Sequence, residues 1–237
     1  ARKAVTLYSY DALNRLTART YPANPALNVQ YHYDMTAEGN NGIGRLTAVQ
    51  DASGILGYHY DARGNLTEQL RSVDVLGVDH YDRVAYQYDG ANQLRRISYP
   101  SGIAVSYQRN GAGQVEQIDL QIGSNPAMPL ATQISYLPFG PLKTLTWGNG
   151  IVLNRQYDQD YQMAEQAIGP WTSTYGFDPN GNIDSLNHSL WGPLQYNYDA
   201  LDRLTLEQGE DKKKTYAYDA AGNRLNRITY SLDDGTE

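Results

Sequence analysis

The chain contains the stretch Tyr58-His59-Tyr60-Asp61-Ala62-Arg63-Gly64-Asn65-Leu66-Thr67, which is the clearest copy of a short recurring unit. Its two tyrosines are two residues apart, so in an extended strand they share one face, while His59 and Asp61 take the other. The following Ala62-Arg63-Gly64-Asn65 tolerates the positive φ that a tight hairpin needs. Leu66-Thr67 then begins a returning strand. One unit therefore predicts one β-hairpin.

The same phrase, Tyr-x-Tyr-Asp followed by a turn and Arg/Asn-Leu-Thr, recurs about ten times along the chain. Two copies are eroded and read Tyr107-Gln108-Arg109-Asn110 and Tyr136-Leu137-Pro138-Phe139. The other copies keep a signature of aromatic residues and aspartate: Tyr8, Tyr10, Asp11, Tyr31, Tyr33, Asp34, Tyr58, Tyr60, Asp61, Tyr86, Tyr88, Asp89, Tyr157, Asp158, Phe177, Asp178, Tyr196, Tyr198, Asp199, Tyr216, Tyr218 and Asp219. Such a repeat is typical of an array in which each unit buries surface against its neighbours.

The composition has 21 tyrosines and only 2 phenylalanines. Tyrosine combines an apolar ring with a hydroxyl that needs water or a hydrogen-bond partner, so it suits half-solvated surfaces. A sealed two-layer core would use more Phe, Ile and Leu. We therefore expect a thin sheet with at least one face in water.

Charge and the missing cysteines exclude several functions. The net charge of −7 argues against a nucleic-acid partner, because phosphate neutralisation needs a basic surface. The basic run Lys212-Lys213-Lys214 lies beside Glu210 and Asp211, and we expect it at a solvated hairpin tip. Without cysteine there is no disulfide or thiolate-metal chemistry. We find no signal peptide and no apolar run near the ~18 residues of a membrane span.

The repeats join into one continuous meander in this interpretation. The returning strand often ends in a second turn signal, as at Asp51-Ala52-Ser53-Gly54 and Tyr99-Pro100-Ser101-Gly102. We predict an all-β fold, an antiparallel meander of repeat hairpins. Two strands in each of about ten repeats would give on the order of twenty strands, and open sheets rarely exceed ~10 strands without curling or splitting. We therefore expect a curled or spiralling sheet, part of a hollow shell. A β-propeller is the alternative, but its blades need ~40 residues each.

We expect a single array over residues 1–237, incomplete at both ends. The segment 121–130, which contains Asn125-Pro126 and Met128-Pro129, is predicted as an insert between strands, and Met35 to Gly44 lengthens one turn. The chain opens without Met and stops within a unit at Gly235-Thr236-Glu237, which suggests a piece of something longer.

Apolar residues three apart conflict with a regular strand, because that spacing puts them on opposite faces. The pairs are Leu46/Val49, Leu94/Ile97, Val115/Ile118, Leu142/Leu145 and Leu225/Ile228. Either a β-bulge recurs at this place or both faces of the sheet are partly covered. The sequence does not separate these two interpretations.

The repeated aspartates have two interpretations. Asp beside Gly and Asn is also found in calcium-binding repeats. Equivalent residues of successive repeats, however, would lie two strands or roughly 10 Å apart, too far to share an ion. We favour a turn cap, in which each Asp accepts from the N–H groups of its own hairpin. The same spacing argues against a metal at His32 and His59. We find no nucleophile elbow, phosphate loop or zinc motif, and we expect no catalytic residue, metal or cofactor.

The tryptophans Trp147, Trp171 and Trp191 lie beside Gly or Pro at predicted turns. Exposed Trp can stack on sugars, so a carbohydrate-binding or adhesive surface is the alternative function. Such residues also commonly cover the rim of a sheet.

The phrases Tyr60-Asp61-Ala62-Arg63-Gly64-Asn65-Leu66-Thr67, Tyr198-Asp199-Ala200-Leu201-Asp202-Arg203-Leu204-Thr205 and Tyr218-Asp219-Ala220-Ala221-Gly222-Asn223-Arg224 resemble the YD repeats of the rearrangement-hotspot (Rhs) family. The resemblance covers essentially the whole chain. That family includes bacterial polymorphic toxins, the C component of insecticidal toxin complexes and the teneurins. Asp178-Pro179-Asn180-Gly181 is similar to the family's self-cleavage segment only superficially, because it occupies an ordinary repeat turn.

The resemblance implies a strip of sheet that spirals into a cocoon, which in the bacterial toxins encloses a C-terminal toxin domain. We therefore expect a non-enzymatic wall segment of such a shell, from a secreted, cell-surface or injected bacterial protein. Its partners would be the rest of its own shell and the enclosed toxin domain. Because a strip exposes sheet edges, the fragment could also associate edge to edge.

Overall fold

The computed structural model describes residues 5–138 and 140–232, so Phe139 and both chain ends lie outside the described residues. Within this part, twenty β-strands and two short 3₁₀ turns are present and no α-helix is found. Each described pairing joins strands that are antiparallel and consecutive in the chain. The prediction of an all-β antiparallel meander is confirmed. The chain divides into two compact units, with the boundary between Leu130 and Ala131. A single array over residues 1–237 therefore remains a prediction.

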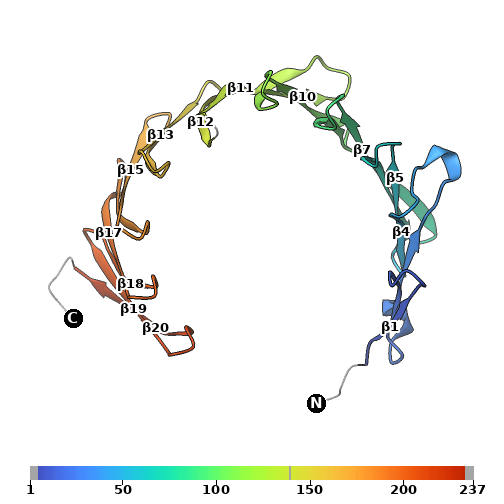
Figure 1. Cartoon of the computed structure of the whole chain (residues 1–237), viewed down its shortest axis with the longest axis horizontal. Coiled ribbons are helices and arrows are strands. Elements are labelled where there is room, and N and C mark those ends of the chain that lie inside the picture. The colour runs from blue at the N-terminus through green and yellow to red at the C-terminus, as the bar shows by residue number, and fades with distance from the viewer. Residues whose placement is uncertain (1–4, 139, 233–237) are drawn as a thin grey trace. The chain divides into compact units, whose positions relative to one another are not determined.

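The first unit carries the strands β1 to β10, laid side by side in chain order (Figure 1). Their bounds are β1 Leu7–Tyr10, β2 Leu16–Thr20, β3 Val29–Tyr33, β4 Leu46–Asp51, β5 Gly54–Tyr60, β6 Leu66–Val75, β7 Val78–Tyr88, β8 Leu94–Ser98, β9 Ile103–Arg109 and β10 Val115–Ile122. The 3₁₀ turns Pro25–Leu27 and Ala37–Gly39 lie in its two longest connections, and the second of these is the lengthened turn predicted at Met35 to Gly44.

The second unit continues with β11, which begins just before the boundary, through β20. The bounds are β11 Met128–Tyr136, β12 Leu142–Trp147, β13 Val152–Tyr157, β14 Met163–Ile168, β15 Trp171–Phe177, β16 Ile183–His188, β17 Gly192–Tyr198, β18 Leu204–Gln208, β19 Lys212–Tyr218 and β20 Arg224–Ser231. Strands occupy both ends of the segment 121–130, so the connection itself takes only residues 123–127. Lys212, Lys213 and Lys214 open β19 and do not form the hairpin tip that we expected.

The repeat turns of standard length share one backbone geometry, which explains the Gly, Asn and Asp found there. The N–H of Asp61 donates to the carbonyl of Asn65, and the N–H of Gly64 donates back to the carbonyl of Asp61. Gly64 has φ +86°, and the equivalent Asn14 and Asp202 also have positive φ. A three-residue loop whose last residue is left-handed is a common hairpin connection, and Gly, Asn and Asp adopt that conformation at least cost.

A β-bulge follows almost every repeat turn and resolves the spacing of the apolar residues. Tyr60 lies opposite Leu66, but His59 lies opposite Glu68, so Thr67 is the extra residue. Two neighbours on the bulged strand then face one partner, which restores residues three apart to one face. The same shift puts Leu46 and Val49 opposite Tyr33 and Tyr31.

The other four pairs divide between this arrangement and a displaced one. Leu94/Ile97 and Val115/Ile118 also begin opposite the repeat's second signature position, at a residue followed by a register shift. Leu142/Leu145 begins opposite Tyr136, and Leu137 opens the turn where other repeats have Asp. The eroded copy that we read as Tyr136-Leu137-Pro138-Phe139 was therefore aligned wrongly, because Tyr136 takes the second place of the phrase and not the first. In the last repeat the leucine comes one residue later in the sequence than in the other repeats. Arg224 lies opposite Tyr218 and Leu225 is the extra residue, which leaves Leu225 66% exposed.

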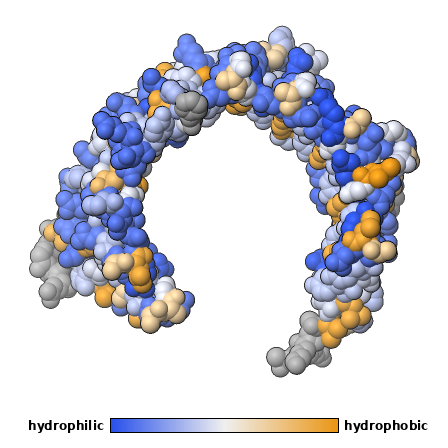
Figure 2. Space-filling view, viewed as in Figure 1, coloured by the Kyte–Doolittle hydropathy of each residue, from blue (hydrophilic) through white to orange (hydrophobic). Residues whose placement is uncertain are grey.

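The two faces of the sheet differ in chemistry. The tyrosine face carries both tyrosines of each phrase and the leucines, valines and isoleucines opposite them. The opposite, polar face carries the middle residue of each phrase and many amide and hydroxyl groups. On it, Arg96 donates to Ser106 and Gln121. Few residues are fully buried, as expected for a single layer, and the visible surface is mostly hydrophilic with scattered apolar patches (Figure 2).

Candidate functional site

The second tyrosine of a repeat ties that repeat to the one before it. The Tyr60 hydroxyl donates to the carbonyl of Leu46 at 2.7 Å, and the Tyr33 hydroxyl donates to the carbonyl of Leu16 at 2.9 Å. We call this bond the tyrosine clamp. It recurs at Tyr88, Tyr157, Tyr198 and Tyr218. Burial raises the pKa of Tyr60, so its hydroxyl stays protonated and able to donate. A net contribution of about 1 kcal/mol per clamp is typical of such hydrogen bonds.

The eroded copy at Tyr107 keeps the clamp with a different side chain. Arg109 occupies the place of the second tyrosine, and its Nη1 donates to the carbonyl of Leu94 at 2.5 Å. The carbonyl that accepts is equivalent to those of Leu16 and Leu46. The position therefore requires a long side chain with a terminal donor, and this requirement is not specific to tyrosine.

The aspartate of each phrase caps its own turn. Oδ1 of Asp61 accepts from the N–H groups of Arg63 and Asn65, each at 2.9 Å, and Oδ2 accepts from the Asn65 side chain at 2.9 Å. Asp11, Asp89, Asp158, Asp178 and Asp199 accept from the same two backbone positions of their own turns. Asp34, in the longer turn, accepts from Gly44 instead.

Hydrogen bonding holds the pKa of five of these carboxyls below its ordinary value: Asp11, Asp61, Asp89, Asp178 and Asp199. For Asp61 the largest cause is the side-chain amide of Asn65, followed among the lowering causes by the two backbone N–H groups. The pKa of Asp199 is lowered first by the Arg203 side chain. The ionised carboxylate accepts these bonds more strongly than the acid, so folding favours ionisation. The aspartates therefore act on their own turns.

In several repeats the residue four places after the aspartate links one repeat turn to the next. Arg15 donates to both Asp11 and Asp34, and its guanidinium lies 4.4 Å from the centre of the Tyr33 ring. In the second unit Arg203 bonds Asp199 and the carbonyl of Asp219. Asn182 reaches Asp178 and Asp202 in the same way. These links, together with the threonine hydroxyl that donates from the bulge of Thr67 to the carbonyl of His59, were not predicted from the sequence.

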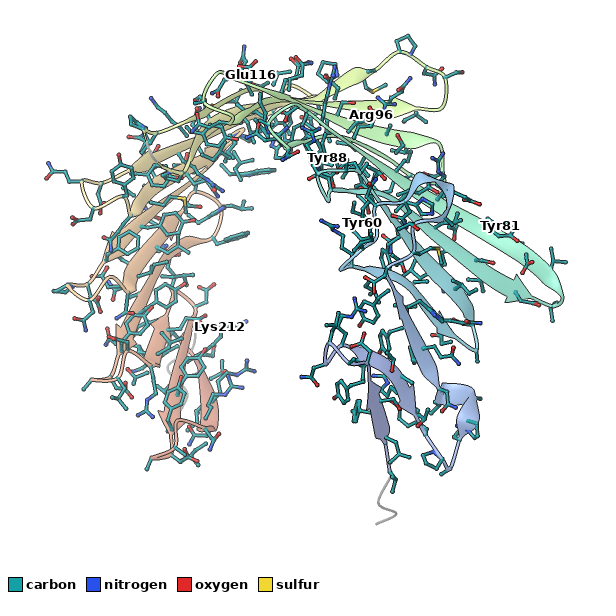
Figure 3. The ribbon with its side chains drawn as sticks, turned by 45° about the vertical axis from the view of Figure 1, so that its right-hand side comes forward. Tyr60, Tyr81, Tyr88, Arg96, Glu116 and Lys212 are labelled. Carbon is teal, nitrogen blue, oxygen red and sulfur yellow. The ribbon has the colours of Figure 1, made fainter. Side chains whose placement is uncertain are left out.

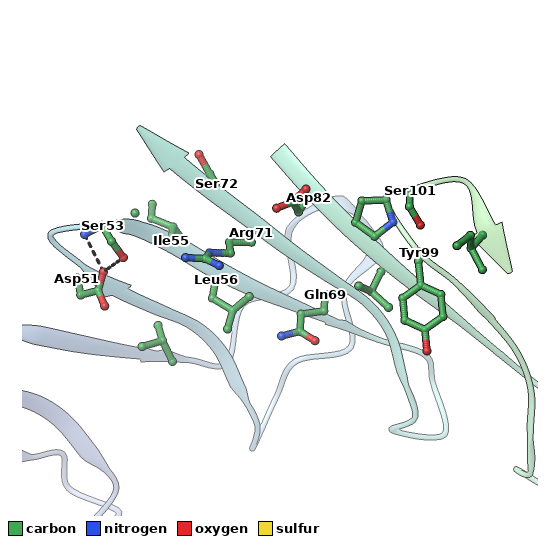
Figure 4. A pocket seen from close by; sticks show the side chains of 15 residues that line it. Asp51, Ser53, Ile55, Leu56, Gln69, Arg71, Ser72, Asp82, Tyr99 and Ser101 are labelled. Atoms are coloured by element: carbon green, nitrogen blue, oxygen red, sulfur yellow. Dashed lines mark hydrogen bonds between the residues drawn. The ribbon is translucent and has the colours of Figure 1, made fainter. Parts of the chain in front are cut away.

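A trough of about 990 Å³ lies on the tyrosine face of the first unit (Figure 4). Its apolar walls are Val49, Leu56, Val84, Tyr99, Pro100 and Ile103, and its polar lining includes Asp51, Ser53, Gln69, Arg71 and Asp82. The guanidinium of Arg71 points toward the β4–β5 turn, where Asp51 and Ser53 are hydrogen-bonded. Ser53 is the main cause of the lowered pKa of Asp51, and the charge of Arg71 adds to it. A trough with apolar walls and both charged and neutral polar groups in its lining suits the side chains of an extended polypeptide.

The three tryptophans lie in alternate hairpin turns, at one end of the strands of the second unit. Trp147 ends β12, Trp171 begins β15 and Trp191 precedes β17, and they are 42%, 49% and 68% exposed. The rings of His188 and Trp191 stack with their centres 3.8 Å apart. In a meander, alternate turns lie at the same end of the strands. The three rings therefore lie along one end of the sheet, and the repeat turns lie at the other end.

Metal-ligating and membrane-spanning features were also sought in residues 5–138 and 140–232. No three His, Asp or Glu side chains in this part come together as metal ligands do. No helix in the same part is long and apolar enough to cross a bilayer.

Comparison with known proteins finds similarity to a repeat family and to a toxin. Residues 41–74 match the family model RHS Repeat. The chain is 25% identical over 231 residues to double-stranded DNA deaminase toxin A of Burkholderia cenocepacia (strain H111), and the match covers 93% of this chain. It spans only 14% of that relative's length.

Solved structures share the fold. A TcdB2-TccC3 crystal structure without the hypervariable C-terminal region superposes with a TM-score of 0.82 at 14% identity, over 96% of this chain and 14% of the other. The Tc holotoxin pore of Photorhabdus luminescens gives 0.75 at 14% identity, over 98% and 15% of the two chains. The family match at residues 41–74 and the shared fold agree with the resemblance of these repeats to those of the Rhs family.

Proposed function

We propose that this chain is a non-catalytic part of the wall of an Rhs-type β-shell that encloses a toxin or effector domain. The observation that carries the proposal is the tyrosine clamp, which recurs in both units and, where it occurs, joins a repeat to its predecessor. The bonds among the described repeats serve to hold the sheet together. The named toxins among its relatives supply the second argument.

Containment is the mechanism. Interstrand hydrogen bonds, clamps and linked turns make a stiff layer, since opening one repeat breaks bonds to both neighbours. A stiff layer keeps proteases and other proteins away from a polypeptide behind it. The trough lined by Arg71 is one place where the enclosed chain could be held. The partners are then the rest of the shell and the enclosed domain, in a bacterial protein that is secreted, displayed or injected.

Limited proteolysis of the full-length protein that carries this chain tests the proposal. We expect the enclosed domain to survive a protease that digests the same domain when it is produced alone. A variant with Tyr60→Ala, Tyr88→Ala and Asp61→Ala should lose part of that protection, because it removes two clamps and one turn cap. Rapid digestion of the domain while the shell stays intact would rule out containment.

The row of tryptophans favours a second candidate, an adhesive or carbohydrate-binding edge. Trp191 and Trp171 present large apolar rings to water at regular intervals, an arrangement that suits stacking on successive sugar rings. A glycan array should then show binding that Trp147→Ala, Trp171→Ala and Trp191→Ala each weaken. Leu190→Ala is the matched control, because Leu190 is 62% exposed beside Trp191 and has no ring. Equal binding by all four variants would eliminate this candidate.

A further inference from the structure

The hairpin of β6 and β7 extends beyond its neighbours and leaves one strand edge open. β6 pairs with β7 all the way from Glu68 and Ala85 to Val75 and Val78. β8, however, pairs with β7 only from Ala85 onward. Residues 78–84 of β7 therefore have β6 on one side and, among the residues that the structure describes, no strand on the other. Figure 3 shows Tyr81 on this projecting hairpin.

The turn at the tip decides which backbone groups point toward the open side. Leu76 and Gly77 both have positive φ, 56° and 80°, as in the two-residue turn that closes on a hydrogen-bonded pair, here Val75 and Val78. Backbone groups alternate in direction along a strand, so those of His80 and Asp82 also face β6. The N–H and C=O groups of Asp79, Tyr81 and Arg83 face outward.

The open edge has a sequence that complements itself when reversed. It reads Val78-Asp79-His80-Tyr81-Asp82-Arg83-Val84. In an antiparallel pairing centred on Tyr81, Asp79 lies opposite the partner's Arg83 and His80 lies opposite the partner's Asp82. Valine then faces valine at both ends, and Tyr81 faces the partner's Tyr81.

The hydrogen-bond phase agrees with this register. Each outward residue among Asp79, Tyr81 and Arg83 meets an outward residue of the other copy, so the two strands can exchange N–H to C=O bonds at all three places. A register shifted by one residue would bring outward groups against inward ones.

We propose that this edge pairs with the same edge of a second copy of the chain, in a two-fold symmetric β-ribbon contact. The same patch serves on both copies, as closed dimers require. The charged pairs fix the register, because opposite charges directly across a strand pair stabilise and like charges destabilise. The proposal goes beyond enclosure, since it joins one wall to another.

The side chains are available for this contact. Tyr81 is 64% exposed and the Arg83 side chain is 64% exposed. Arg83 already bonds Glu68 on its own hairpin, which holds the guanidinium on the polar face, where the partner's Asp79 would lie. A contact of this size is below the ~1,000 Å² typical of permanent interfaces, so the dimer should form reversibly and with concentration.

Sedimentation velocity of the 237-residue chain over a range of concentrations tests the proposal, with charge variants as the decisive arm. The wild type should shift from monomer to dimer. Asp79→Arg sets two Arg against two Arg across the contact, and Arg83→Asp sets two Asp against two Asp, so each variant alone should lose the dimer. An equimolar mixture of the two should regain it, because every pair is again of opposite charge. The double variant Asp79→Arg, Arg83→Asp should dimerise like the wild type.

The mixture also distinguishes a broken contact from a broken fold. A misfolded variant cannot be rescued by another variant, and circular dichroism of each protein checks its fold. Tyr81→Pro should abolish the dimer, since it removes an outward N–H without touching the bonds to β6. If the variants associate as the wild type does, the contact lies at another edge and the proposal is wrong. It is also wrong if the wild type stays monomeric or if the mixture gives no dimer.

Discussion

The hairpins β5–β6 and β9–β10 are copies of one repeat, the first intact and the second eroded. In β5–β6, Tyr60 clamps the carbonyl of Leu46 and Asp61 caps the turn. In β9–β10 the corresponding residues are Arg109 and Asn110, yet Arg109 clamps the carbonyl of Leu94 and Oδ1 of Asn110 accepts from Ala112 and Gln114. The bulge follows both turns. The repeat therefore preserves a set of hydrogen bonds, and several side chains can supply them.

Among the changes that test this comparison, removal of the Asp61 cap should lower the stability of its hairpin most. Asp61→Ala leaves the N–H groups of Arg63 and Asn65 without their acceptor, and each lost bond costs about 1 kcal/mol. We expect a loss of about 2–3 kcal/mol in the local free energy of opening. Amide exchange of the β5–β6 hairpin measures it, since local units open separately in a repeat array.

The controls for the cap use the two copies. Asp61→Asn should cost much less than Asp61→Ala, because Asn110 shows that an amide oxygen can fill the role. His59→Ala, on the polar face of the same strand, should leave exchange at Asn65 nearly unchanged. Equal effects of Asp61→Asn and Asp61→Ala would contradict the equivalence of the two turns.

Removal of the clamp should have an intermediate effect, and a similar one in both hairpins. Tyr60→Phe and Arg109→Met each delete the donor and retain most of the side-chain volume, so we expect about 1 kcal/mol of destabilisation for each. Urea unfolding followed by tyrosine fluorescence and amide exchange measures the change. Tyr58→Phe is the matched control, because the first tyrosine of this phrase makes no hydroxyl bond within the described residues. A cost for Tyr58→Phe as large as for Tyr60→Phe would contradict the clamp.

Acid should destabilise the turn of β5–β6 and leave the turn of β9–β10 unchanged. The folded pKa of Asp61 is lowered, first by the Asn65 side chain, so the stabilisation it brings is fully present above its ordinary value of ~3.9. That stabilisation is lost as the pH falls through the depressed folded pKa. We expect exchange-corrected opening of Asn65 to rise several-fold in this range while opening of Gln114 stays level, since Asn110 does not titrate. A parallel rise at both sites would point to global acid unfolding.

Repair of the eroded turn should have the smallest effect. Asn110→Asp places a carboxylate where the amide oxygen now accepts two backbone N–H bonds, and Arg109 lies next to it in the chain. Charge-assisted bonds are stronger than neutral ones, so we expect a gain of about 0.5 kcal/mol. Thermal unfolding at neutral pH, repeated at a pH of about 3, measures it. The gain should shrink in acid, and a gain that is independent of pH would have another cause.

The sequence predicted the fold well because its strand and turn signals are local. The two tyrosines at alternate positions, and Gly or Asn three residues after Asp, each act within one hairpin, and the antiparallel meander follows from their repetition. The bulge remained undecided because register is a property of two strands together. Its marker was visible in retrospect, since Thr47 and Thr67 sit at the extra residue and donate to the carbonyl across the pair.

Bonds between repeats were the part that could not be predicted. The clamp at Tyr60 joins residues fourteen apart, and Arg15 reaches Asp34 over nineteen. Such partners depend on sheet twist and on the length of the intervening turns, neither of which one repeat specifies. The trough around Arg71 likewise draws on residues from Val49 to Ile103. The sugar-stacking role of Trp147, Trp171 and Trp191 remains a proposal.

The direction of the clamp has a consequence for how the protein is made. In every clamp described above, a side chain later in the sequence donates to a carbonyl earlier in it. A repeat that has just left the ribosome therefore lacks this hydrogen bond until the next repeat has also emerged. Synthesis runs in the same sense, and segments made first can fold first. We therefore expect a stalled translation product to lack the clamp on its final repeat, because the residue that donates that bond belongs to the next repeat.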